Sequence, residues 1–305
     1  MSGADDKDTW VGRRELLRHL FLVGAVTGAG LILFPDLSRT PGAEVLAAPA
    51  PSPALPGSPP DKQDPAGITV RPDDPAIIAG PVEYRGVITS LTGYLSAPAR
   101  PDVYPGILVL HDVTGMSEHV RDVTRRLSKV GYVALALDLL SRLGGTAKFG
   151  DPANVSTALS ALTPSQYLVD LDQSVSYLEA RPVVAKSKIG VLGFGFGGSL
   201  AWLLLSQNPD LKAGAIFYAS LPSSAVIPRI TAAVQAIFGD VEQRNLKEIT
   251  DFDLAMKQAG IPWAYKVESK AGRGFFDDSR DRYVPDAAKD AWNLTLDWYA
   301  KHLGG

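Results

Sequence analysis

The sequence predicts an α/β protein whose mostly parallel sheet is covered by helices on both faces. Continuous apolar runs of strand length, such as "GILVLHD" at 106–112, alternate with segments of helical periodicity. Such runs are typical of parallel strands that are buried on both sides. A third observation is the glycine-rich turn "GFGFGG" at 193–198, which joins one of these strands to a helix.

The expected elements follow one another from Pro81 onward. Two half-exposed strands come first, within 82–98, with a turn near 89–92. Thr163 followed by Pro164 predicts one helix start, and Gly131 predicts the end of an earlier helix. Buried strands are expected at 106–112, 132–138, 188–194, 212–220, 232–240 and 263–269, and helices at 117–131, 163–182, 197–207, 246–260 and 287–303.

The amino-acid composition excludes several classes of function. The chain has 305 residues, of which 46% are hydrophobic, and a formal net charge of −3. This length and apolar content are enough for one large domain with its own core. The near-neutral charge gives no reason to expect a nucleic-acid partner. The absence of cysteine excludes disulfides, thiolate metal sites and a cysteine nucleophile.

Residues 1–47 have the pattern of a targeting segment. Arg13 and Arg14 precede an apolar run over 20–34, which is within the range of a signal peptide and short for a membrane span. The paired arginines resemble a twin-arginine export signal. The alternative is an uncleaved single-helix anchor, which would then be the chain's membrane contact. Both interpretations predict an exported, extracytoplasmic domain.

Residues 48–80 are rich in proline and alanine and show no apolar periodicity. Such a segment cannot bury enough surface to offset the entropy lost on ordering, so we expect a disordered linker. A proline-rich ligand for a partner protein is the alternative. The folded domain is then expected at 81–305.

The turn at 193–198 lies where a nucleophile elbow would lie. An elbow places its nucleophile between a strand and a helix, at the centre of G-x-Nuc-x-G. That centre is Gly195, which has no side chain. The turn therefore favours an α/β-hydrolase fold without its nucleophile. A glycine-rich turn in another doubly wound fold is the alternative.

Three blocks carry a resemblance to a known family: "HDVTGMSEHVRDVTRRLSKVGYVALALDLLSRLGG", "GVLGFGFGGSLAW" and "KAGRGFFDDSRDRYVPDAAKDAWNLTLDWYAKHL". The chain resembles the dienelactone hydrolase family over about 81–303, particularly its exported branch. The resemblance implies an α/β-hydrolase fold and a carboxylic-ester or lactone hydrolase that needs no cofactor. It also implies a Cys-His-Asp triad.

The resemblance places the three triad positions on Gly195, Glu242 and Arg273. Gly195 offers no attacking atom, and the arginine stays protonated and cannot act as a base. Loss of the nucleophile or the base costs several orders of magnitude in rate. We expect Arg273 and Glu242 to form an ion pair where the family's histidine and aspartate touch.

Few other residues could take over the chemistry. Ser199 lies one helical turn beyond the elbow and is expected to point along the helix. His111 is expected to be structural at the end of its strand, and His119 to be a solvated surface residue. A metal site at His111 and Asp112 lacks further ligands at a suitable spacing, so we predict no metal.

Further pocket residues follow from the resemblance. Asp112 stands where family members often carry a glutamate near the nucleophile. The backbone N–H groups of Val113 and Phe196 are expected to form the oxyanion hole. Arg142 aligns with an arginine that holds the substrate carboxylate, although a loop-bracing role is equally consistent with the sequence. Asp277 replaces a second anion-binding arginine, which argues against dienelactone itself as the ligand.

Two functions remain open. One is a pseudoenzyme that keeps the hydrolase scaffold to bind a small ester or anionic ligand, which Gly195 and Arg273 favour. The other is an ester or lactone hydrolase that uses a water or a displaced residue in the same pocket, which the intact elbow glycines favour.

Overall fold

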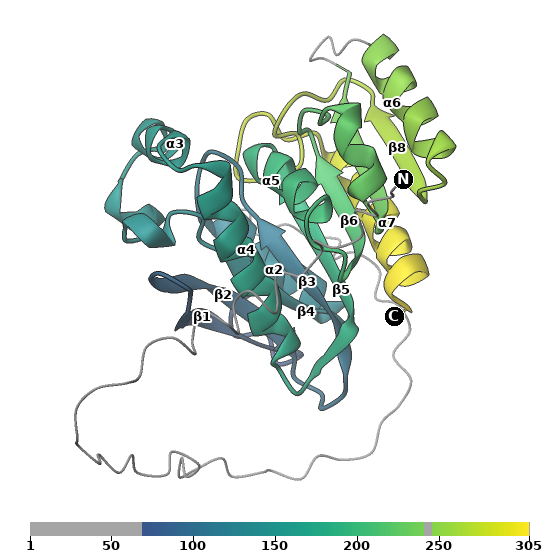
Figure 1. The fold of residues 1–305 in the computed structure, drawn as a ribbon. Helices are drawn as coiled ribbons and strands as arrows, with labels where there is room; N and C mark the ends of the chain where they lie inside the picture. Colours follow the sequence, from purple (N-terminus) through teal and green to yellow (C-terminus); the bar gives the residue numbers. More distant parts are fainter. Residues whose placement is uncertain (1–68, 241–245, 305) are drawn as a thin grey trace, which may run out of the picture. The chain divides into compact units, whose positions relative to one another are not determined.

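A computed structural model describes residues 69–240 and 246–304 (Figure 1). Eight strands form one sheet in the order β1-β2-β4-β3-β5-β6-β7-β8. The pairs β1–β2 and β2–β4 are antiparallel and all later pairs are parallel, which confirms the expected sheet. The strands are β1 (Ile77–Arg85), β2 (Ser90–Pro98), β3 (Tyr104–Leu110), β4 (Val133–Leu137), β5 (Val184–Phe194), β6 (Leu211–Phe217), β7 (Ala233–Gly239) and β8 (Trp263–Glu268).

Helices cover both faces of the sheet because its strands are apolar on both. Successive side chains of a strand point to opposite faces. Leu108 and Leu110 of β3 therefore join the core under α3, α4, α5 and α6, whereas Ile107 and Val109 join the core under α2 and α7. The helices are α2 (Glu118–Lys129), α3 (Pro152–Ser160), α4 (Pro164–Glu179), α5 (Phe196–Leu205), α6 (Leu246–Gln258) and α7 (Pro285–Tyr299).

Local signals account for most helix starts. Thr163 and Gln166 form a reciprocal capping box at the start of α4, and Ser117 caps α2. The helix α3 was not anticipated, although Asp151 caps it and Pro152 opens it. Those two residues are a start signal, but the nine-residue helix has only a short apolar face. None of the described helices is both long and apolar enough to cross a bilayer.

The fold begins before Pro81, so the expected boundary of the linker at residue 80 is wrong. Val70 is buried; its N–H donates to Asp122 Oδ1 at 2.7 Å, and its carbonyl accepts from Arg125 Nε at 2.5 Å. β1 then begins at Ile77. The targeting segment at 1–47 and the linker up to residue 68 lie outside the described residues.

Candidate functional site

The elbow at Gly195 joins the end of β5 to the start of α5. Gly195 has φ +51° and ψ −108°, and its N–H donates to the Phe217 carbonyl at 2.9 Å. Glycine adopts this left-handed φ without strain, whereas other residues are strained there by about 1–3 kcal/mol. The close passage of strand and helix also needs the flanking glycines, because a Cβ on Gly193 would lie 2.6 Å from the Gly197 carbonyl oxygen.

The space above Gly195 is filled by the side chain of Asp112. A Cβ on Gly195 would lie 2.3 Å from Asp112 Oδ1 and 2.4 Å from both Cγ and Oδ2. Asp112 follows β3, which is the parallel neighbour of β5, so the sheet brings the two strand ends together. The carboxylate thus stands where the side chain of an elbow residue would stand.

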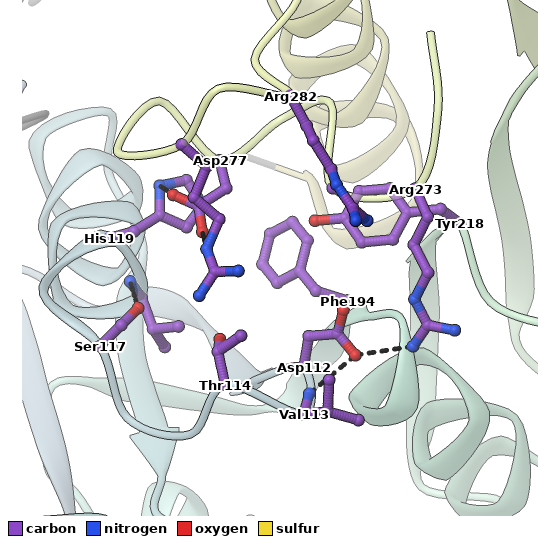
Figure 2. Close-up of a pocket in the computed structure, with 13 residues that line it drawn as sticks. Asp112, Val113, Thr114, Ser117, His119, Phe194, Tyr218, Arg273, Asp277 and Arg282 are labelled. Atoms are coloured by element: carbon purple, nitrogen blue, oxygen red, sulfur yellow. Dashed lines mark hydrogen bonds and ion pairs between the residues drawn. The ribbon is translucent and has the colours of Figure 1, made fainter. Parts of the chain in front are cut away.

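Three donors converge on one oxygen of this carboxylate. Asp112 Oδ1 accepts from the N–H of Val113 and from the N–H of Phe196, each at 2.8 Å. Arg273 Nη2, on the loop after β8, donates to the same oxygen at 2.8 Å. Hydrogen bonds to an ionised acceptor are stronger than neutral ones. The two backbone donors expected to form an oxyanion hole therefore hold an internal anion (Figure 2).

Arg273 was expected to pair with Glu242, and the structure shows that it pairs with Asp112. Glu242 lies outside the described residues, so its pairing with Arg273 stays a prediction. The Asp112–Arg273 contact joins residues 161 positions apart, and the Arg273 side chain keeps 43% of its surface exposed.

A pocket of about 110 Å³ opens beside this carboxylate (Figure 2). Asp277 and Arg280 form an ion pair of 3.1 Å on its rim. Arg282 also lines the pocket and has no ion pair among the described residues. The lining consists of Asp112, Val113, Thr114, Ser117, His119, Val120, Phe194, Tyr218, Arg273, Gly274, Asp277, Arg280 and Arg282.

Tyr218 is the pocket residue that sequence reasoning missed. It follows β6 with φ +39°, a strained conformation for a non-glycine residue, and its N–H donates to the Ile237 carbonyl at 2.7 Å. Burial raises the pKa of its phenol well above the ordinary value, and the carboxylates of Asp112 and Asp277 raise it further. The hydroxyl is therefore a neutral donor at physiological pH. "FYAS" alone carries no signal for this role.

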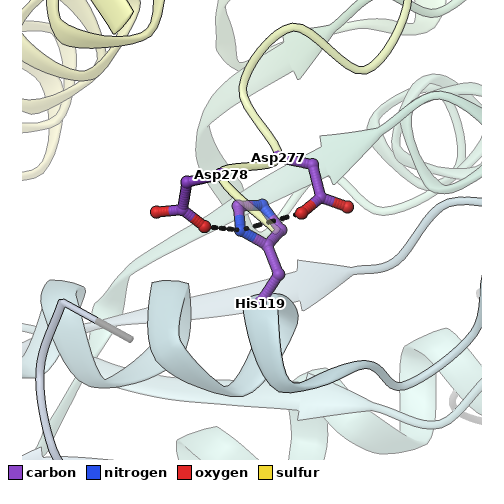
Figure 3. Close-up of side chains that lie close together, drawn as sticks. All are labelled: His119, Asp277 and Asp278. Atoms are coloured by element: carbon purple, nitrogen blue, oxygen red, sulfur yellow. Dashed lines mark hydrogen bonds and ion pairs between the residues drawn. The ribbon is translucent and has the colours of Figure 1, made fainter. Parts of the chain in front are cut away.

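His119 is buried, so the expectation of a solvated surface residue is wrong. Its Nδ1 lies 2.9 Å from Asp278 Oδ1 and 3.5 Å from Asp277 Oδ1 (Figure 3). Burial raises the pKa of Asp278, but the His119 hydrogen bond and the charge of Arg126 outweigh it and lower that pKa to about 2. The sequence places His119 at a helix start, which indicates exposure, while the loop carrying Asp277 and Asp278 covers it.

This histidine–aspartate cluster has the residue types of a metal site, with ligand atoms within 4.8 Å of one another. However, Asp277 also accepts from Ser279 Oγ at 2.6 Å, and Asp278 accepts from Arg126. Donors already occupy these oxygens, so a cation would have to displace them. The geometry is that of an internal charge network that ties the loop after β8 to α2.

Three other residues considered from the sequence are absent from the lining of this pocket. Arg142 forms a bidentate pair with Asp170 of α4, at 2.6 and 2.8 Å, and does not line this pocket. This pair is the bracing interaction that the sequence allowed, and a role of Arg142 at a ligand stays a prediction. Ser199 is exposed on α5. His111 is fully buried; its Nδ1 lies 2.8 Å from the Asp112 carbonyl, and its Nε2 accepts from the Leu139 N–H.

Comparison with known proteins identifies the family of this chain. The family model described as "Dienelactone hydrolase family" matches residues 91–303. A protein of Methylorubrum extorquens described as "Putative carboxymethylenebutenolidase" is 31% identical over 249 residues, which cover 78% of this chain and 86% of that protein.

Solved structures resemble the fold as well. One titled "Putative Dienelactone Hydrolase" from Klebsiella pneumoniae has a TM-score of 0.69 at 27% identity and covers 74% of this chain and all of that one. A dienelactone hydrolase from Anabaena variabilis has a TM-score of 0.60 at 18% identity, covering 75% of this chain and 99% of that one.

Proposed function

This chain belongs to the dienelactone hydrolase family, and from that premise we propose that it keeps the family's α/β-hydrolase scaffold as a binding module that no longer hydrolyses esters or lactones. One observation carries the proposal: the Asp112 carboxylate lies in the hole formed by the Val113 and Phe196 N–H groups, above a glycine.

Acyl transfer needs an attacking atom, a base and an empty anion hole. Gly195 supplies no attacking atom, and Arg273 supplies no base. The third requirement fails for a separate reason. A carbonyl oxygen that becomes negative in the transition state would have to displace Asp112 from three charge-assisted hydrogen bonds.

The charges of the pocket favour a small anion as its ligand. Asp112 pairs with Arg273, and Asp277 pairs with Arg280. These pairs cancel, and Arg282 adds a positive charge that no described carboxylate neutralises. The Arg282 guanidinium and the neutral Tyr218 hydroxyl would together bind a small molecule with one carboxylate or a polar ester group.

A second candidate function is favoured by the same carboxylate. Asp112 could activate a water, which would make the chain a rewired hydrolase. The two functions differ in turnover: a binding module leaves an activated ester intact, whereas a rewired hydrolase cleaves it and loses that activity in Asp112→Asn.

The test is hydrolysis of 4-nitrophenyl acetate by the full chain. We expect wild type to match buffer. The triple variant Gly195→Cys/Arg273→His/Asp112→Ala restores a nucleophile and a base and empties the hole, and should exceed wild type at least about tenfold. The matched control, Gly195→Cys/Arg273→His, retains Asp112 and should be slower than the triple variant. Wild-type turnover that disappears in Asp112→Asn would overturn the proposal in favour of the rewired hydrolase.

A further inference from the structure

The two oxygens of the Asp112 carboxylate have different surroundings. Oδ1 accepts all three hydrogen bonds, from Val113, Phe196 and Arg273. Oδ2 has no hydrogen-bond partner among the described residues, and Figure 2 shows the carboxylate directed into the pocket. A carboxylate held by one oxygen and open at the other can act as a nucleophile that forms a covalent ester.

The occupied hole limits what such a nucleophile can attack. Attack on an ester carbonyl creates a new oxyanion that needs donors, but the Val113 and Phe196 N–H groups are already bound to Oδ1. Displacement at a saturated carbon creates no carbonyl oxyanion. In such a displacement the negative charge develops on the leaving atom, on the side of the carbon opposite the attacking oxygen.

The pocket offers groups for that leaving atom. Tyr218 and Arg282 line the same cavity as Asp112, and Figure 2 draws all three around it. The Tyr218 hydroxyl has no hydrogen-bond partner among the described residues, so it is available to donate a proton. Burial raises its pKa, which keeps that proton in place until an alkoxide forms.

We propose that Asp112 captures small electrophiles by alkylation of Oδ2, and that they are acids with a reactive saturated carbon, such as epoxy acids or α-halo acids. The inference rests on the proposed ligand pocket. With an epoxide, Oδ2 forms a bond to carbon as the ring C–O bond breaks. The alkoxide takes the Tyr218 proton, and the phenolate is reprotonated by solvent. With a halide, the carbon–halogen bond breaks and the halide ion leaves without a proton.

The captured group stays bound because hydrolysis of the Asp112 ester lacks a base. Release requires water to attack Asp112 Cγ, with Oδ1 becoming the oxyanion in the hole that already surrounds it. A base at position 273 would activate that water, but the residue is Arg273. The site therefore performs a single turnover, and Arg273→His should convert capture into turnover.

The experiment is peptide mass spectrometry of the full chain after timed exposure to glycidate or bromoacetate. The chain contains no cysteine, so no thiolate competes. We expect the ester on Asp112 to form at least about tenfold faster than on Asp251, an aspartate with 63% of its side chain exposed. Asp112→Asn should lose the adduct while retaining the wild-type thermal unfolding temperature within a few degrees.

Tyr218→Phe separates proton donation from packing. It should slow capture of glycidate by at least about tenfold and leave capture of bromoacetate within about twofold, because only the alkoxide needs a proton. Equal slowing with both reagents would overturn the acid role of Tyr218. Labelling of Asp112 no faster than that of Asp251, or labelling of His119 in its place, would overturn the proposal itself.

These outcomes are independent of the ester assay. A chain that neither cleaves 4-nitrophenyl acetate nor forms the Asp112 ester keeps the proposed binding function and loses only this inference. A chain that cleaves the acetate ester loses the proposed function, whatever the alkylation result.

Discussion

The Asp112 carboxylate occupies the volume that a side chain at Gly195 would need, with Oδ1 only 2.3 Å from the place of a Cβ. The two residues lie on neighbouring parallel strand ends, so a change in one constrains the other. This relationship links the elbow glycine to the carboxylate that the Val113 and Phe196 N–H groups hold, and it can be measured as an energetic coupling.

Gly195→Ala should destabilise the fold by more than a positive φ alone explains. The φ of +51° costs about 1–3 kcal/mol, and displacement of Asp112 adds to it. In an Asp112→Ala background the same change should cost at least about 1 kcal/mol less. Urea unfolding of the four chains measures this coupling.

The matched control is Gly131→Ala. Gly131 also has a positive φ, +99°, but a Cβ there meets no atom within 4 Å. Its cost should be the same with or without Asp112. Equal costs of Gly195→Ala in both backgrounds would contradict the steric relationship.

Asp278 should stabilise the fold at neutral pH and lose that effect in acid. The pKa of its carboxyl is lowered to about 2, against about 3.9 in an unfolded chain. A depressed pKa means that the stabilisation is present above pH 4 and is lost as the pH falls through 2. The difference in unfolding free energy between wild type and Asp278→Asn should be about 2 kcal/mol at pH 7 and shrink toward pH 2.

Urea unfolding across that pH range tests the prediction. The control is Asp251→Asn on the exposed face of α6, where the change should stay within about 0.5 kcal/mol. A difference between wild type and Asp278→Asn that does not change from pH 7 to pH 2 would speak against the charge network.

Arg142→Gln should destabilise the fold by about 3–5 kcal/mol without changing ligand capture. It leaves the Asp170 carboxylate buried without its guanidinium partner. Burial already raises the pKa of Asp170, and loss of Arg142 raises it further. The carboxyl then takes up a proton more readily, so the loss should be smaller at pH 5 than at pH 7.

Chemical denaturation and the glycidate assay together distinguish the two roles of Arg142. If Arg142 only braces α4, the substitution changes the unfolding free energy and leaves the rate of Asp112 labelling unchanged. Slower labelling of Asp112 in a folded Arg142→Gln chain would instead support the ligand-binding role that the family resemblance implies.

A chain that begins at residue 76 should be less stable than one that begins at residue 66. The shorter chain loses Val70, so Asp122 and the fully buried Arg125 each lose a backbone partner. Each buried group left without a partner costs about 1–3 kcal/mol. Equal thermal stability of the two chains would show that the Val70 contacts do not stabilise the fold.

Patterns within one segment were predicted well. The buried strands are recognised from continuous apolar runs, α4 from Thr163 and Pro164, and the elbow from glycines that permit close passage and a positive φ. The absence of a side chain at the centre of the elbow is likewise a property of Gly195 alone. The strand order at the antiparallel edge is not visible in this way, because pairing joins segments that are far apart.

The sequence by itself determined that the turn after β5 centres on a glycine and that residue 273 is an arginine, since residue identity settles which atoms exist. Only the tertiary structure decided that Asp112 fills the hole, that Arg142 braces α4 and that His119 is buried. Their contacts span 84, 28 and 159 positions of sequence. The direction of a short side chain follows from such distant neighbours, and no local periodicity encodes it.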